Sequence, residues 1–370
     1  MVTSRLRRRV LPTLALLVPA AAALGVLRWP GEAMDAVREG LRLCGESLIP
    51  ALFPFLVLSS LLIRLGLAPA LGRWLAPALR AVLGVGEPGA AALTLGLIGG
   101  YPVGAATVAQ LYTSGGCDRV EAHRLLAFCN NAGPAFLVGI AGVGVYGSAR
   151  VGLLLWGIHA LAALLTGLLL RLRYGPVTAQ GKISPQSRPE PFLPAFLAAV
   201  QGSVPTLLNV CAFVLLFGVG LRLLELSGIL ALGTNALAGL GIPRSAGRSL
   251  LSGALELTRG LTLLEPRPSS LPLCAALLGW GGVSVHCQTL SLLHAAGLES
   301  RPYLAGKLAQ SILSGALAAL ALRLWPGVTE AARFATPLHR PAAVPAWELL
   351  LFSAALAGTM LLLSLLRRRK

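Results

Sequence analysis

The chain has 370 residues, of which 55% are hydrophobic and only 12% are charged, and its mean hydropathy is +0.76. An average soluble domain carries roughly 25% charged residues, so this composition excludes a soluble globular protein and indicates an integral membrane protein. The net charge of +17 comes from 31 Lys and Arg against 14 Asp and Glu. No aromatic-and-basic surface motif accompanies this charge, so nucleic acid is not an expected partner.

Six stretches match or approach the length of about 20 apolar residues that a bilayer core of roughly 30 Å requires. They are Val10 to Leu27, Ile49 to Leu67, Val151 to Leu170, Val204 to Leu224, Leu308 to Leu324 and Trp347 to Leu366. Basic clusters at segment ends, such as Arg5 to Arg9 and Arg367 to Lys370, fit the positive-inside rule. The sequence therefore predicts a multi-pass protein in the lipid bilayer, with an even number of crossings and both termini in the cytoplasm.

The first stretch also resembles a signal peptide, because a basic start, an apolar run and the small residues PAAAALG follow one another. The run is long for a signal peptide and many further spans follow. We therefore expect residues 1–30 to form a retained transmembrane helix, with cleavage as the alternative.

Two polar interruptions divide the remaining chain. Residues 173–192 are rich in Pro, Gly, Gln and Ser, which predicts a linker outside the bilayer. Residues 325–346 are expected to form a polar loop before a last transmembrane helix and basic tail at 347–370. The parts between them, 31–172 and 193–324, are expected to be two related halves.

The halves share three similar segments, each pair separated by about 155 residues. The pairs are SLIPALFPFLVL (Ser47 to Leu58) with GSVPTLLNVCAFVLL (Gly202 to Leu216), GLIGGYPVG (Gly96 to Gly104) with LSGALELTRG (Leu251 to Gly260), and LTGLLLRL (Leu165 to Leu172) with LAALALRL (Leu317 to Leu324). So long a period excludes a solenoid and predicts a duplication. Repeated halves with interrupted segments at matching positions point to a secondary transporter of two inverted repeats.

Four interrupted segments combine a backbone breaker with polar side chains at expected membrane depth. They are GGYPVGA (Gly99 to Ala105), CNNAGP (Cys129 to Pro134), ELTRG (Glu256 to Gly260) and WGGVSVHCQ (Trp280 to Gln288). Non-helical backbone is tolerated within a bilayer only where it is buried in protein or lines a watery cavity. A single interruption could be a Pro kink in a packing helix, but four matched ones favour a binding site. The fold is thus predicted to be an all-α polytopic membrane protein with broken helices and re-entrant hairpins.

The substrate-binding residues are expected within these four segments. If the chain unwinds before Pro134, the helix restarting there presents free N–H groups and a positive dipole end, which attract an anion. The amides of Asn130 and Asn131 are expected to donate to the same anion. The full predicted set is Gly99, Gly100, Tyr101, Pro102, Gly104, Asn130, Asn131, Gly133, Glu256, Thr258, Arg259, Gly281, Gly282, Ser284, His286 and Gln288.

Three charged or titratable side chains of this region have alternative interpretations. Glu256 and Arg259 are three residues apart and would neutralise each other on a helix, either structurally or beside a transport pathway. His286 could carry a coupling proton or contact an anionic ligand, or it could simply be a satisfied packing residue. Lys307 is expected to extend along the helix toward the membrane interface, and it shares a helix face with Gln310.

Other polar groups carry no chemistry in this interpretation. The six cysteines show no CxxC pair and no His partner at ligand spacing, so neither a metal site nor a cofactor is expected. Cys117 to His123 is interpreted as the solvated start of a helix. Because no nucleophile, base and orienting residue form a set, we do not expect an enzyme.

Together these elements resemble the YlbJ-type sporulation integral membrane proteins, also called stage V sporulation protein V, within the wider nucleoside-recognition or Gate-domain group. The resemblance is carried by GGYPVGA, FCNNAGPAFLVG, VGVYGSARVG, ELTRG and GGVSVHCQ, and extends from about Glu39 to Leu324. Two departures from the family pattern, at Gly99 and Ala132, remove Ser hydroxyls.

The resemblance implies a fold similar to concentrative nucleoside transporters, with residues 31–172 and 193–324 as two Gate-like repeats, placed in the outer forespore membrane or the cell membrane. It implies transport of dipicolinic acid, a small anionic aromatic acid, with Arg259 as its charge partner. A non-transporting sporulation scaffold and a nucleoside carrier are the alternatives. Coupling to H+ or Na+, the direction of flux and assembly into a homo-oligomer stay open.

Overall fold

A computed structural model of the chain describes residues 16–175 and 190–325, and every regular element within these ranges is a helix. Within these described ranges, five helices are long and apolar enough to cross a membrane, or six if a pair bent by 104° counts as one span. The five are Pro30–Arg64, Ala149–Tyr174, Phe192–Leu226, Pro268–Ala295 and Arg301–Leu324, and the bent pair is Arg73–Leu83 with Glu87–Gly99. The prediction of an all-helical, multi-pass membrane protein is confirmed.

The predicted spans that begin at Ile49, Val151, Val204 and Leu308 each coincide with one of these long helices. The predicted first span, Val10 to Leu27, coincides over its described part with a helix at Leu16–Arg28. The last predicted span, Trp347 to Leu366, lies outside the described residues.

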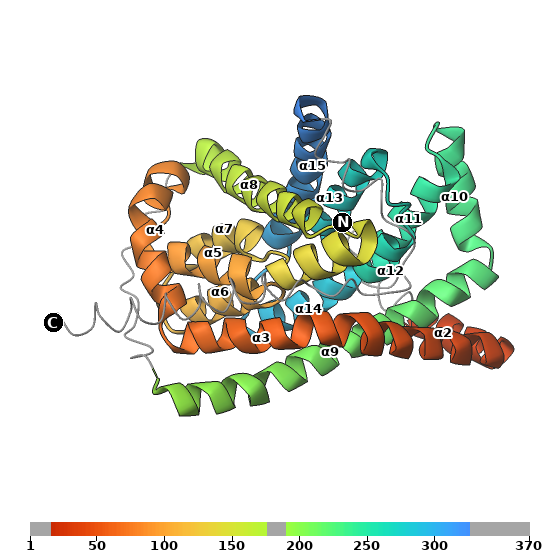
Figure 1. Cartoon of the computed structure of the whole chain (residues 1–370), viewed down its shortest axis with the longest axis horizontal. Coiled ribbons are helices and arrows are strands. Elements are labelled where there is room, and N and C mark those ends of the chain that lie inside the picture. The colour runs from red at the N-terminus through yellow and green to blue at the C-terminus, as the bar shows by residue number, and fades with distance from the viewer. Residues whose placement is uncertain (1–15, 176–189, 326–370) are drawn as a thin grey trace, which may run out of the picture. The chain divides into compact units, whose positions relative to one another are not determined.

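The described helices follow the same order in the two halves of the chain: a long helix, a shorter one, two interrupted helices and a final long helix (Figure 1). In the first half they are α2 (Pro30–Leu43), the π-helical η1 (Cys44–Leu48), α3 (Ile49–Arg64), α4 (Leu67–Leu83), α5 (Glu87–Gly99), α6 (Val103–Thr113), α7 (Arg119–Cys129), the π-helical η2 (Ala135–Val145) and α8 (Ala149–Tyr174).

In the second half they are α9 (Phe192–Leu226), α10 (Ile229–Gly239), α11 (Arg244–Leu255), α12 (Leu257–Thr262), the short η3 (Pro268–Ser270), α13 (Leu271–Trp280), α14 (Gly282–Ala295) and α15 (Arg301–Leu324). This shared order is what a duplicated chain would give. An inverted relation between the halves stays a prediction.

All four predicted interruptions are breaks between helices: α5 from α6, α7 from η2, α11 from α12, and α13 from α14. The backbone explains two of them directly. Gly100 has φ +76°, and Gly281 and Gly282 have φ +93° and +82°, a left-handed region that side chains with a Cβ rarely adopt. Glu256 is extended, with φ −134° and ψ 113°, and Asn130 is also extended. The peptide bond before Pro102 is cis.

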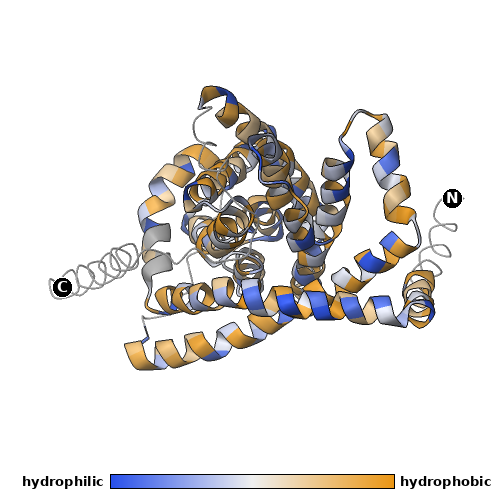
Figure 2. Cartoon of the chain, turned by 45° about the vertical axis from the view of Figure 1, so that its right-hand side comes forward, coloured by the Kyte–Doolittle hydropathy of each residue, from blue (hydrophilic) through white to orange (hydrophobic). Residues whose placement is uncertain are grey.

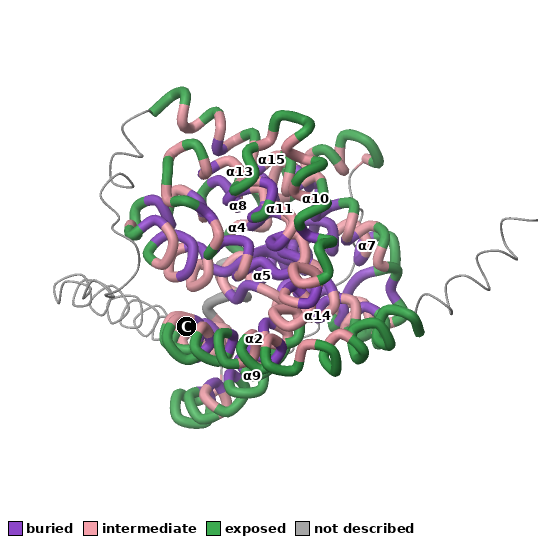
Figure 3. The backbone as a smooth tube through the Cα atoms, turned by 90° about the vertical axis from the view of Figure 1, so that its right-hand side faces the viewer, coloured by how far each residue is buried: buried purple, intermediate pink, exposed green. Residues whose placement is uncertain are grey.

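The long helices expose apolar side chains, as expected for surfaces that contact lipid. Helices α3 and α9 lie side by side along one edge of the helical body (Figure 1). Both are largely hydrophobic, whereas hydrophilic residues gather toward α2 (Figure 2). Leu208 and Leu216 of α9 are 61% and 66% exposed. Buried residues concentrate instead around α5 and the other broken helices (Figure 3).

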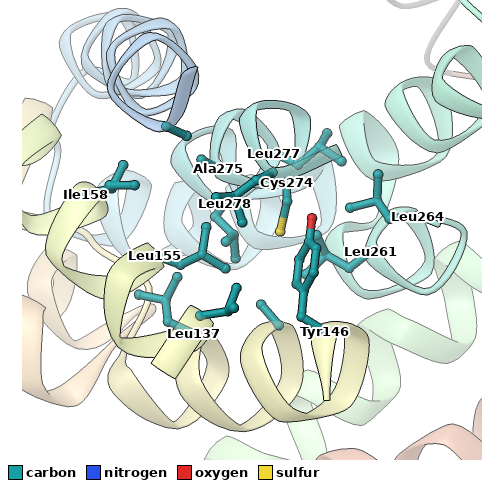
Figure 4. Close-up of a cluster of buried hydrophobic side chains, with 14 of the residues drawn as sticks. Leu137, Tyr146, Leu155, Ile158, Leu261, Leu264, Cys274, Ala275, Leu277 and Leu278 are labelled. Carbon is teal, nitrogen blue, oxygen red and sulfur yellow. The ribbon is translucent and has the colours of Figure 1, made fainter. Parts of the chain in front are cut away.

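The largest described cluster of buried apolar side chains joins the two halves. It combines Leu137 and Tyr146 from the region of η2 with Leu155 of α8 and with residues of α12 and α13, including Leu261 and Leu277 (Figure 4). The buried Tyr146 hydroxyl is 2.9 Å from the Ser270 hydroxyl, which satisfies its polar end. The two halves are therefore packed through a common core.

The predicted helix start at Cys117 to His123 is present, because Asp118 caps α7 by accepting a hydrogen bond from the Glu121 amide at 2.7 Å. The expectation that this whole face is solvated was wrong. Glu121 is 1% exposed and Cys117 is 7% exposed, since the α7 helix packs against α5, α6, α8 and α15.

Candidate functional site

The four breaks meet around one pocket. The pocket has a volume of about 730 Å³ when its open mouth is included, and helices α3 and α9 form its outer wall. The breaks contribute Gly99, Gly100, Tyr101, Gly133, Ala135, Phe136, Glu256, Leu257, Thr258, Ser284, Val285 and Gln288; the wall contributes Leu52, Phe55, Leu56, Thr206, Val210, Phe213 and Val214. A mostly apolar pocket with a few polar groups is typical of small-molecule sites.

Half of the sixteen predicted residues line this pocket, and the other half lie around it. Those that line it are Gly99, Gly100, Tyr101, Gly133, Glu256, Thr258, Ser284 and Gln288. Pro102, Gly104, Asn130, Asn131, Arg259, Gly281, Gly282 and His286 are not among the lining residues. All four predicted segments therefore reach this pocket, while their side chains divide between the pocket and its surroundings.

The helices that restart after the breaks differ in how their first amide groups are satisfied. The Glu256 carboxylate caps α12, accepting from the amides of Thr258 at 3.0 Å and Arg259 at 2.6 Å. The side-chain oxygen of Asn130 accepts from the Ala105 amide in the first turn of α6 at 3.3 Å. No side chain caps η2 or α14.

The first turns of both helices help to line the pocket, through Ala135 and Phe136 of η2 and through Ser284 and Val285 of α14. In η2 the Phe136 amide already donates to the Gly133 carbonyl at 3.1 Å. The first amide groups of a helix have no partner within the helix. Uncapped N–H groups that open on a cavity attract negative charge or hydrogen-bond acceptors.

Asn130 and Asn131 are completely buried and bonded to protein groups. The Asn130 amide nitrogen donates to the Thr289 hydroxyl at 3.0 Å, and that of Asn131 donates to the Phe128 carbonyl at 2.9 Å. The expectation that both amides face an anion does not match this arrangement. Such short polar side chains instead satisfy the backbone and neighbouring helices where the helix is broken.

The ion pair expected between Glu256 and Arg259 does not form, because the helix breaks at Glu256 and its carboxylate turns back as a cap. Arg259 instead donates two hydrogen bonds to Glu39 of α2, at 2.5 and 3.1 Å. This pair lines a second, charged pocket between α2, α9 and α12, with a volume of about 500 Å³ when its open mouth is included. Glu256 lines both pockets, so it lies between the charged pocket and the central one.

His286 is 3% exposed, and its Nδ1 atom is hydrogen-bonded to the Tyr303 hydroxyl at 2.8 Å. The Trp280 ring lies edge-on to the imidazole, with the two ring centroids 4.3 Å apart. This is the geometry of the packing alternative. Its Nε2 atom is nevertheless buried without a partner among the described residues. A role for His286 in carrying a proton stays a prediction.

Several of the predicted glycines pack closely against other protein backbone. A Cβ atom at Gly104 would lie 2.0 Å from the Cys129 carbonyl oxygen, and one at Gly100 would lie 2.9 Å from the Gly133 amide nitrogen. The first two breaks therefore touch each other directly.

Lys307 was misassigned by the sequence analysis. It does not extend toward the interface but is completely buried on α15, with its ammonium 2.7 Å from the Gln310 side-chain oxygen and 3.1 Å from the Tyr101 hydroxyl. Gln310 in turn donates to Asn131 at 2.8 Å and lies 3.2 Å from His159 Nε2. A polar network therefore lies directly behind Tyr101 at the pocket.

His159 and Tyr303 were not predicted, although one signal was available. His159 stands in the middle of the apolar span of α8, and an ionisable residue inside a membrane span suggests function by default. Its Nε2 atom accepts a hydrogen bond from the Ala132 amide at 3.1 Å, inside the α7–η2 break.

Comparison with known proteins adds the family. A family model named Gate and described as nucleoside recognition matches residues 46–170. The sporulation integral membrane protein YlbJ of Bacillus subtilis (strain 168) is 32% identical over 327 residues, which cover 81% of this chain and 79% of the relative. The chain belongs to the YlbJ family of sporulation integral membrane proteins. No solved structure matches it.

Membership of the YlbJ family confirms the resemblance in the sequence and agrees with the five apolar helices: the protein is a multi-pass integral membrane protein. The Gate match extends from η1 to α8 and so includes the first two breaks. The Gate-like character expected of the second half stays a prediction.

Proposed function

We propose that this YlbJ-family protein is a carrier of a small anionic aromatic acid, in the first instance dipicolinic acid, across the outer forespore membrane. The observation that carries the proposal is the central pocket, which is lined in part by the first turns of η2 and α14, two helices without a side-chain cap. Two carboxylates on one ring would accept hydrogen bonds from both ends at once. The name of the Bacillus subtilis relative supports a role in sporulation.

The walls of the pocket suit the ring of such a cargo. Phe55, Phe136 and Phe213 line it together with aliphatic side chains, and aromatic rings pack favourably edge-to-face or offset. Glu256 also lines the pocket, but its carboxylate is bonded to the first amides of α12, whose positive end offsets its charge. Thr258 and Gln288 supply neutral hydrogen-bonding groups.

In this proposal, the two halves form inverted repeats and the pocket opens alternately to the two sides of the membrane. Broken helices that meet near the middle of a bilayer are the usual site of such carriers. Both chain termini would lie in the cytoplasm, as the basic end segments favour.

A nucleoside carrier is the second candidate, because the Gate family model is described as nucleoside recognition. The pocket residues Thr258, Ser284 and Gln288 could bond a ribose or base without any charge. Arg259, the cation expected to bind an anion, is already paired with Glu39 outside this pocket.

A thermal-shift panel on the purified full-length chain separates these candidates, because a ligand that binds only the folded form raises the apparent Tm. We expect a rise with dipicolinate, a smaller one with simple dicarboxylates and none with nucleosides. A rise with nucleosides alone would replace the first candidate by the second.

Two tryptophan variants on α9 test the site. Val210→Trp places an indole in the pocket, whereas Leu208→Trp, one half-turn away, adds the same ring to a side chain that is 61% exposed. Dipicolinate should stabilise Leu208→Trp as it does the unmodified chain, and should not stabilise Val210→Trp. Equal shifts in both variants would show that the cargo binds elsewhere.

A further inference from the structure

Lys307 is held by three oxygen atoms, one of which is the Asn130 carbonyl at the broken end of α7. Its ammonium lies 3.2 Å from the Asn130 carbonyl, 3.1 Å from the Tyr101 hydroxyl and 2.7 Å from the Gln310 side-chain oxygen. The side chain is completely buried, and the Tyr101 ring centroid lies 5.0 Å from the charge. A lysine has three N–H donors and this one has three acceptors, so each donor is used.

The directions of the surrounding hydrogen bonds identify a protonated amine. The Tyr101 hydroxyl donates to the Leu278 carbonyl at 3.0 Å, so its oxygen must accept from Lys307. Gln310 uses its amide nitrogen on Asn131, which leaves its oxygen for Lys307. Asn130 offers a carbonyl, which can only accept. The network is therefore complete when Lys307 carries its charge.

This charge lies where broken-helix carriers hold a coupling cation. Asn130 directly follows the C-terminal end of α7, and unwound carbonyls at such half-helix ends, which carry partial negative charge, bind the coupling ion. No carboxylate in the described ranges forms an ion pair with Lys307. Only the Tyr101 side chain separates this unneutralised ammonium from the pocket, because Tyr101 lines the pocket and also accepts a hydrogen bond from Lys307.

We propose that Lys307 is the resident coupling cation of this carrier: it replaces a bound sodium ion, and the proton that it binds and releases crosses the membrane with the anionic cargo. This inference rests on the proposed carrier function. An anion in the pocket favours the charged form of Lys307, so cargo and proton are expected to bind together and to leave together.

Tyr101 is the hydrogen-bond partner that can switch from accepting to donating when Lys307 loses a proton. When the ammonium loses a proton to water in the pocket, one N–H bond breaks and a lone pair remains on the nitrogen. The two carbonyl acceptors cannot donate to it, but the Tyr101 hydroxyl can turn from the Leu278 carbonyl and donate. Tyr101 lines the pocket and also touches the position of Gly281, so the proton is linked to the first and fourth breaks.

Other titratable groups surround this network and must be considered in any pH profile. The α15 helix itself contributes Tyr303, α8 contributes His159, and α14 contributes His286 behind Tyr303. Helix α13 carries only a thiol, at Cys274. Helix α7 carries the thiol of Cys129 next to the break and, at its other end, Glu121 and His123.

The experiment uses the full chain in liposomes with a pH dye inside and labelled dipicolinate outside, near pH 7, where both cargo carboxylates are ionised. We expect the same initial uptake rate in sodium and in potassium buffers, and acidification of the lumen during uptake. Uptake that requires sodium, or that moves no protons, would overturn the inference while leaving the carrier function intact. Absence of uptake and of binding under every condition would instead overturn the carrier function.

Three variants locate the effect. Lys307→Gln should weaken dipicolinate binding more than about tenfold, because the positive charge behind Tyr101 is lost, and should abolish acidification. Ser314→Ala, on the same buried face of α15 but with a hydroxyl that has no described partner, should behave as the unmodified chain. Tyr101→Phe keeps the ring and removes the switch, so the pH dependence of uptake should change.

Lys307→Gln could fail to fold, so the Tyr101→Phe result also stands alone. A Tyr101→Phe pH profile identical to that of the unmodified chain would overturn the proposed switch, because a purely structural tyrosine would change stability but not proton coupling. Proton movement that persists in a folded Lys307→Gln variant would overturn the role of Lys307.

Discussion

Replacing Gly306 by alanine should force apart two helices whose backbones touch. Gly306 precedes Lys307 on α15, and a Cβ atom there would lie 2.1 Å from the Ala127 carbonyl oxygen and 2.5 Å from its Cα on α7. Favourable non-bonded contacts lie at about 3.5–4 Å, so one helix must move by on the order of 1 Å or more. That shift would lengthen the 3.2 Å contact from Lys307 to Asn130.

The expected cost follows from the nature of the obstacle. Overpacking typically costs about 1–3 kcal/mol, and a backbone carbonyl cannot rotate away as a side chain can, so the upper end applies. The matched control is Gly157→Ala on α8, where a Cβ atom meets nothing within 4 Å. Alanine there should be neutral or stabilise the helix by up to about 1 kcal/mol. The two variants should therefore differ by roughly 3 kcal/mol or more.

The measurement is the apparent Tm of both purified variants in the same detergent, read by intrinsic fluorescence and by the fraction that stays monodisperse on heating. Gly306→Ala should melt several degrees below the unmodified chain, and Gly157→Ala at or above it. Equal melting of the two variants would refute the close α7–α15 contact, and with it the position assigned to Lys307.

Three further predictions concern carboxylates. Burial, together with the negative charge of the nearby Asp118, raises the pKa of Glu121 to about 7 from its ordinary 4.5. The free energy of unfolding should therefore fall by at most about 3 kcal/mol as the pH rises from about 4.5 to 7. Thermal melts across that range should show a smaller decline for Glu121→Gln. Glu256→Ala should lower stability by about 0.5–2 kcal/mol through loss of the α12 cap, with Glu256→Gln retaining more of it. Glu39→Gln breaks an ion pair that is 31% and 48% exposed, so its Tm should change little; a large drop would contradict that exposure.

The positions of the breaks could be predicted because their causes are local. Gly281 and Gly282 occupy left-handed backbone that follows directly from residue type, and Pro134 starts η2 where its missing amide costs nothing. Apolar length likewise gave the spans of α8 and α9. Neither inference requires knowledge of the tertiary packing.

The partners of polar side chains could not be predicted, because they lie far apart in sequence. Arg259 pairs with Glu39, 220 residues away, although Glu256 was the obvious neighbour. Lys307 near one end of an apolar window resembles a side chain that reaches the interface. Its depth is set by the packing of α15 on α7, which Gly306 permits. The small residue beside a lone lysine was the available signal.

The breaks also show how a membrane protein can satisfy unwound backbone without help from cargo. Within bilayer-like surroundings every free amide must find a partner. At the first and third breaks Asn130 and Glu256 supply such a partner. At η2 and α14 no side chain does so, although the Gly133 carbonyl accepts from two amides of η2. The first turns of both helices line the same pocket, so a ligand that accepts hydrogen bonds at two separate points suits it best.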